Sequence, residues 1–142
     1  MVRLIMGVKG SGKTKQLIEL VNAAAKDEPG NVVCIEAGTI MTYDIHYHIR
    51  LIDAVEYKID SYEVFRGFIS GLYAGNYDIS HVFIDNLCKI VGDDCGHETE
   101  QFLAWLDQFG ALHHFIQDFL EILLLLIHTR IITPINSKAN AA

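Results

Sequence analysis

Residues 7–14 read Gly7-Val8-Lys9-Gly10-Ser11-Gly12-Lys13-Thr14, a match to the pattern G-x-x-x-x-G-K-S/T. The segment before them, residues 2–6, is mostly apolar and rich in residue types that favour strands. In the segment after them, residues 14–26, apolar side chains recur at helical spacing. The pattern therefore lies between a predicted strand and a predicted helix, which is the context that it requires in a folded protein.

The residue types of this stretch suit a polyphosphate ligand. Its glycines allow backbone conformations that bring N–H groups close to an anion, and the first turn of the following helix adds the positive end of the helix dipole. Lys13 supplies a cation for the β- and γ-phosphates, and the hydroxyl of Thr14 is a hard ligand for Mg²⁺. The alternative is a glycine-rich turn that binds nothing. We predict that the nucleotide is bound by Gly7, Val8, Lys9, Gly10, Ser11, Gly12, Lys13, Thr14 and Lys15.

A second candidate site residue ends an apolar segment later in the chain. Residues 79–84 read as a buried strand, and Asp85 follows at its carboxyl end. An Asp in this position next to a phosphate loop holds Mg²⁺ directly or through water. We therefore predict Thr14 and Asp85 as metal ligands, and Lys13 and Asp85 as the catalytic residues.

The general base is not assigned by this pattern. Position 86 is Asn, whose amide can orient water but cannot accept a proton. Glu36, at the end of the preceding predicted strand, is the best substitute in the chain. The simpler interpretation of Glu36 is a solvent-exposed strand end.

The distribution of apolar residues in the other segments predicts an α/β fold. Continuous apolar runs at 31–37 and 122–127 are typical of buried parallel strands, and residues 50–53 suit a short edge strand. Ser61 is a predicted N-cap for a helix that runs to Ala74. A further helix is expected from Thr99 to Phe109, and residues 87–96 are predicted as a loop. We expect a three-layer sandwich with a mainly parallel central sheet, as one domain over residues 1–133 with a tail at 134–142.

Charge and cysteine content narrow the function classes. The 142 residues carry a net charge of −7, and those after residue 30 hold 6 basic against 15 acidic groups, so a nucleic-acid partner is disfavoured. The most apolar run, residues 122–127, is too short to cross a bilayer. An odd number of cysteines without disulfide-like spacing fits a reducing compartment, so we expect a cytoplasmic protein; these are Cys34, Cys88 and Cys95.

Two histidines raise the alternative of a second metal site. His46 and His48 would point to the same side of an extended segment. No third ligand is indicated nearby, so two exposed loop histidines are the simpler interpretation. Tyr43 and Tyr47 are candidates to flank a nucleotide base.

Residues 7–14 and 82–85 together resemble the P-loop NTPase superfamily. Residues 6–15, 31–36 and 75–79 also resemble a group of small, uncharacterised bacterial ATP-binding proteins, some of which carry a label taken from the twitching-motility ATPases. The motility motors are far longer, and their additional His and Asp boxes are missing here, so we do not transfer that label. The resemblance implies a P-loop NTPase fold, ATP and Mg²⁺ as ligands, and His128 or Thr129 as a sensor of the γ-phosphate.

We expect a Mg²⁺-dependent ATP-binding protein with weak hydrolysis, which a protein partner or a second copy of the chain completes by supplying an arginine. The alternative is an ATP-sensing module or switch with little turnover. A small-molecule kinase is less favoured because Arg50 and Arg66 are too isolated to form an Arg-rich lid. ATP is preferred to GTP because no N-K-x-D guanine signature occurs.

Overall fold

A parallel β-sheet forms the centre of the structure, which is a computed structural model. It describes residues 2–6, 12–27, 30–38, 44–93, 96–113 and the backbone of 121–126. The elements in chain order are β1 (Val2–Met6), α1 (Lys13–Asp27), β2 (Asn31–Glu36), β3 (Arg50–Asp53), α2 (Tyr62–Gly75), β4 (Ile79–Ile84), α3 (Leu87–Val91), α4 (His97–His113) and β5 (Glu121–Leu126).

The strand order within the described residues is β1-β5-β4-β2-β3, and every neighbouring pair is parallel. The last strand in sequence, β5, therefore lies between β1, which precedes the phosphate-loop pattern, and β4, which precedes Asp85. Because all strands run in one direction, their carboxyl ends meet at the same edge of the sheet. The predicted α/β class, its parallel sheet and the short edge strand at residues 50–53 are confirmed.

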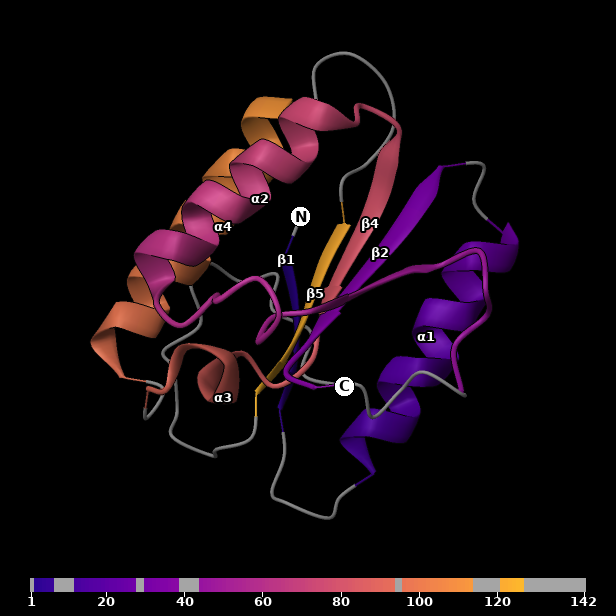
Figure 1. Cartoon of the computed structure of the whole chain (residues 1–142), viewed down its shortest axis with the longest axis horizontal. Helices are drawn as coiled ribbons and strands as arrows, with labels where there is room; N and C mark the ends of the chain where they lie inside the picture. The colour runs from indigo at the N-terminus through magenta and orange to yellow at the C-terminus, as the bar shows by residue number, and fades with distance from the viewer. Residues whose placement is uncertain are drawn as a thin grey trace.

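Helices cover both faces of this sheet (Figure 1). One face packs on α1, where Leu17 and Val21 contact the cluster that contains Cys34 of β2 and Phe83 of β4. The other face packs on α2, α3 and α4, as shown by the second cluster, which contains Ile35 of β2. Side chains of β2 and β4 thus alternate between two apolar layers, which explains their continuous apolar sequences.

The helix that follows Ser61 agrees with its prediction. Ser61 is the N-cap of α2, and its side-chain oxygen accepts a hydrogen bond from the backbone N–H of Val64 at 3.2 Å. Phe65 and Ile69 of this helix are fully buried in the core.

Two helices differ from the prediction. Residues predicted as a loop contain α3, whose five residues are too few to show a helical period in the sequence. The helix predicted to end at Gly110 continues to His113. A glycine inside a helix costs only about 1 kcal/mol relative to alanine, and packing of α4 offsets that cost. Residues 114–120 lie outside the described part of the chain.

A buried hydrogen-bonded cluster joins α2, the segment after α3 and α4. The hydroxyl of Tyr62 contacts the hydroxyl of Thr99, and it donates to the carboxylate of Asp93 at 3.1 Å. The Thr99 hydroxyl also donates to Asp93, at 3.1 Å. Burial, the largest cause, together with Asp93 raises the pKa of Tyr62 to about 12, against the opposing effect of Thr99.

This cluster should make stability fall at alkaline pH. Because the folded-state pKa of Tyr62 is raised above its ordinary value of 10.0, its stabilising contribution is complete below pH 10 and is lost as the pH rises through about 12. In urea denaturation, the free energy of unfolding of the wild type should therefore fall more steeply between those pH values than that of Tyr62→Phe. A matched control is Tyr77→Phe, because Tyr77 is 79% exposed. Parallel curves for the wild type and Tyr62→Phe would contradict the assignment.

Candidate functional site

The candidate site lies at the carboxyl edge of the sheet, where ligands bind in open parallel α/β sheets. Of the predicted nucleotide-binding residues, the structure describes Gly12, Lys13, Thr14 and Lys15. The predicted residues Gly7, Val8, Lys9, Gly10 and Ser11, and the predicted sensors His128 and Thr129, lie outside the described residues.

The start of α1 carries an unusual set of residues for the beginning of a helix. Gly12 has a φ of 79°, a conformation that favours glycine, and its carbonyl oxygen accepts the N–H of Gln16 at 3.1 Å. The first turn contains Lys13 and Lys15 and no acidic residue. Cations at this end oppose the helix dipole, and an anion bound there would be favourable.

The alternation of side chains along β2 and β4 brings two carboxylates to the same face. Cys34 and Phe83 both pack on the α1 side, so Glu36 and Asp85, each two residues further on, are directed to that side. The backbone N–H of Asp85 donates to the carbonyl oxygen of Ile35 at 2.9 Å, which extends the pairing of β2 with β4 to this residue. Because α1 begins with Lys13 on the same face, the structure brings together Lys13, Glu36 and Asp85.

Glu36 is buried, which contradicts the simpler interpretation from the sequence. Its exposed fraction is 1%, although it is the last residue of β2. The strand β3 and the residue after it cover this position, and the N–H of Ala54 donates to the Glu36 carbonyl oxygen at 2.7 Å. The sequence predicted a strand at residues 50–53 but did not place it beside β2.

Asp85 has an unusual environment for a carboxylate. Its Oδ1 atom is buried and makes no hydrogen bond to any described residue. Burial raises the pKa of Asp85, while the charges of Lys89 and Lys13 act in the opposite direction. A buried carboxylate oxygen without a donor is costly in a folded protein, so its presence needs an explanation. A hard divalent cation such as Mg²⁺ fits this oxygen.

Lys13 is itself largely buried, with an exposed fraction of 8%, whereas Thr14 is exposed beside it. Below the site, burial and the neighbouring negative charges of Glu36 and Asp85 raise the pKa of the Cys34 thiol. Cys34 is therefore an uncharged core residue rather than a nucleophile.

The residue after Asp85 has a structural role. Asn86 adopts a left-handed conformation with φ 55°, and its side-chain oxygen accepts the backbone N–H of Lys89 at 3.3 Å. Asn is one of the few residue types that tolerate this conformation, and the side chain caps α3. Its amide oxygen is therefore directed to α3.

Two residues near the site were missed by the sequence interpretation. The Oδ1 atom of Asp53 accepts hydrogen bonds from the N–H groups of Gly38 and Val55, both at 2.9 Å, and so fixes the chain that leaves β2 beside Glu36. An Asp that ends a short strand is a usable signal, but it does not reveal its partners. Lys89 was missed because α3 was predicted as a loop.

The predicted histidine pair lies on an exposed segment that packs on α1. The side chain of Asn22 accepts the N–H of His46 and donates to the Asp44 carbonyl oxygen, both at 2.9 Å. The rings of His46 and His48 stack with centroids 5.0 Å apart, and the ring of Tyr47 stacks on His46 and lies tilted against His48. Among the described residues, no group of three His, Cys, Asp or Glu side chains is placed to hold a metal ion. Tyr43 lies outside those residues.

The cysteines differ from the expectation of unpaired thiols. Cys34 is free, whereas Cys88 of α3 is disulfide-bonded. Cys95, the third cysteine of the chain, lies outside the described residues. The spacing of the cysteines in the sequence did not indicate this bond. The residues around Cys88 were predicted as a loop, so the position of Cys88 in α3 was not foreseen either.

Within the part of the chain that is described, no helix combines the length and the apolar character needed to cross a membrane. No protein-family model matches the chain, and a search of curated proteins also finds no match.

Proposed function

We propose that this chain is a Mg²⁺-dependent ATP-binding protein with a P-loop NTPase fold and slow ATP hydrolysis. The observation that carries the proposal is the buried, unpartnered Oδ1 atom of Asp85, on the same sheet face as Lys13 at the start of α1. The strand order supports it, since β5 lies between β1 and β4. That order resembles the P-loop ATPases in which one strand separates the phosphate-loop strand from the Asp strand.

Each predicted site residue then has a role. The backbone N–H groups of residues 7–14 and the dipole of α1 bind the phosphate chain, and Lys13 neutralises charge on the β- and γ-phosphates. Thr14 and Asp85 would hold Mg²⁺, which would reduce the negative charge that must be stabilised during phosphoryl transfer. Two lysines in the first turn of α1 add positive charge beside the bound triphosphate.

The direct test is titration calorimetry of the purified chain with ATP, in the presence of Mg²⁺ and in excess chelator. The proposal expects saturable binding that is stronger with Mg²⁺. Absence of heat and of any ATP-induced rise in the unfolding temperature would overturn it, because a ligand that binds only the folded state must stabilise that state.

Glu36 is the residue that we assign as the general base. It is buried beside Asp85, on the strand that pairs with β4, and Asn86 is occupied as the cap of α3. Glu36→Gln keeps the shape and removes the proton acceptor, so the rate of phosphate release should fall about 10²- to 10³-fold, while ATP affinity stays within about threefold. Single-turnover phosphate release measures the rate, and calorimetry measures the affinity. Equal rates for Glu36→Gln and the wild type would remove Glu36 from this role.

A second candidate function is an ATP-sensing module with little turnover. The observation that favours it is the use of Asn86 as a helix cap, which leaves no proton acceptor directly after Asp85. The two functions differ in phosphate release by the wild type, and in whether a higher protein concentration accelerates it, as expected if a second copy supplies a catalytic arginine.

A further inference from the structure

The short helix α3 holds its one exposed side chain in a fixed place. Leu87, Cys88, Ile90 and Val91 are buried, whereas Lys89 between them is exposed. The helix is fixed at both ends, because Asn86 caps its start and the N–H of Gly92, in a left-handed conformation, donates to the Cys88 carbonyl oxygen. The disulfide of Cys88 adds a covalent restraint. The backbone of Lys89 therefore has little freedom to move away from this edge.

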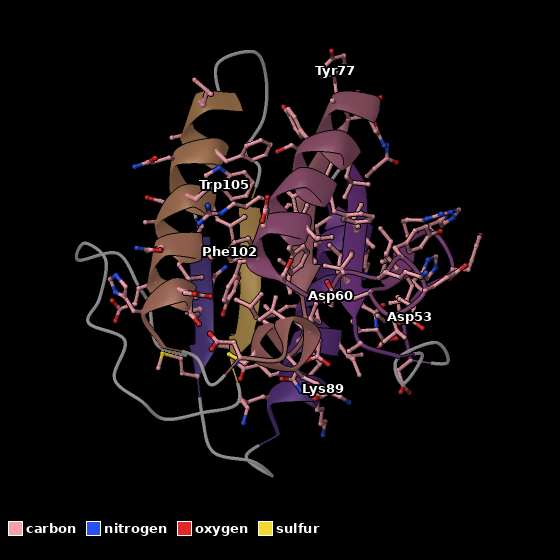
Figure 2. All side chains as sticks on the ribbon, turned by 60° about the vertical axis from the view of Figure 1, so that its left-hand side comes forward. Asp53, Asp60, Tyr77, Lys89, Phe102 and Trp105 are labelled. Carbon is pink, nitrogen blue, oxygen red and sulfur yellow. The ribbon has the colours of Figure 1, made fainter. Side chains whose placement is uncertain are left out.

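Lys89 lies at the same end of the molecule as the proposed phosphate site. The helix begins two residues after Asp85, and the start of α1 and the labelled Lys89 side chain both lie at the lower end of the molecule (Figures 1 and 2). Lys13 approaches Asp85 from the α1 face, whereas α3 packs with the cluster on the opposite face. Asp85 is thus flanked by a cation from each layer.

The charge of Lys89 is available to a ligand. Among the described residues Lys89 forms no ion pair, and its charge acts on Asp85 more strongly than that of Lys13 does. When the Asp85 carboxylate is used by a metal ion, the ammonium group of Lys89 loses this compensating partner. The ammonium group of Lys89 is then available to a phosphate of a ligand bound beside the metal.

Resting on the proposed function, we infer that Lys89 is a second phosphate-binding cation of this site, which acts on the terminal phosphate and makes the site prefer a nucleoside triphosphate to a diphosphate. A metal held by Asp85 would act on the terminal phosphates of a bound triphosphate, and Lys89 follows Asp85 by four residues at the same end of the molecule. The chain thereby supplies in cis a positive charge that a second copy would otherwise provide.

The test compares MgATP and MgADP affinities by calorimetry for the wild type, Lys89→Met and Lys89→Arg. Lys89→Met should weaken MgATP binding about tenfold and MgADP binding less than about twofold, because only the triphosphate loses a charged contact. Lys89→Arg should retain the preference for MgATP. The control is Lys26→Met, since Lys26 is exposed in the last turn of α1, away from its start.

The outcomes separate the two proposals. An unchanged ratio of MgATP to MgADP affinity in Lys89→Met, in a protein whose ATP binding requires Lys13, would overturn the inference about Lys89 and leave the proposed function intact. A wild type that binds neither nucleotide would overturn both. Equal weakening of both nucleotides would also overturn the inference, because it indicates general electrostatic attraction rather than contact with the terminal phosphate.

Discussion

Replacing Lys13 with alanine is expected to weaken ATP binding by about a hundredfold or more, while the protein remains folded. Lys13 is the invariant cation of the phosphate-loop pattern, and its burial at the start of α1 places the ammonium group in a partly desolvated setting. A charge interaction in such a setting is stronger than one on the open surface. Loss of this cation therefore removes a large part of the binding free energy for a triphosphate.

Calorimetry and thermal unfolding together check this prediction. The wild type should gain stability with ATP, by about 2.7 kcal/mol when the nucleotide is a hundredfold above its dissociation constant, and Lys13→Ala should show almost no gain at the same concentration. The far-ultraviolet circular dichroism spectra of the two proteins should agree. Lys26→Ala, at the other end of α1, serves as the control. Wild-type affinity in Lys13→Ala would refute the assigned role of Lys13.

The strands and helices could be predicted where the pattern of apolar residues in the sequence is long and regular. The apolar runs of β2, β4 and β5 and the helical spacing of α1 and α2 lie in the sequence itself, because burial on both sheet faces requires apolar residues at every position. The place of β5 between β1 and β4 has no such local signal. Strand order depends on contacts between residues far apart in the sequence, so it was not predicted.

The environment of the candidate site was predicted less well than its residue types. The pattern identified Lys13 and Asp85, but the burial of Glu36 has no local signal in the sequence. The role of Asn86 as a cap could not be separated from a role in water positioning until α3 was placed. The residues that the sequence interpretation did not identify are those whose function depends on a neighbouring helix or strand.

Replacing Asp85 with asparagine is expected to have two opposite effects. The raised pKa of Asp85 means that the folded state holds a proton there more tightly than the unfolded state does. The charged carboxylate therefore costs stability at neutral pH, and this cost disappears as the pH falls and Asp85 becomes protonated. Asp85→Asn imitates the neutral form, so the nucleotide-free variant should be more stable than the wild type at pH 7.

The second effect concerns the metal. An amide oxygen is a much weaker ligand for Mg²⁺ than a carboxylate, so ATP affinity in Asp85→Asn should lose most of its dependence on Mg²⁺. Calorimetric ATP titrations at several Mg²⁺ concentrations measure this dependence, and urea denaturation without nucleotide measures stability. The control is Asp78→Asn, because Asp78 is exposed and precedes β4 at the opposite edge of the sheet. It should change neither quantity.

The combination of the two effects distinguishes a ligand site from a structural one. If Asp85 were an ordinary structural residue, its replacement would lower stability or leave it unchanged, and the Mg²⁺ titration would not respond. A group that destabilises the empty protein and is needed only when metal and nucleotide are present follows the pattern of functional residues, whose cost is offset by ligand binding. A less stable Asp85→Asn with an unaltered Mg²⁺ titration would therefore reject the metal role of Asp85 and, with it, the main support for nucleotide binding at this edge of the sheet.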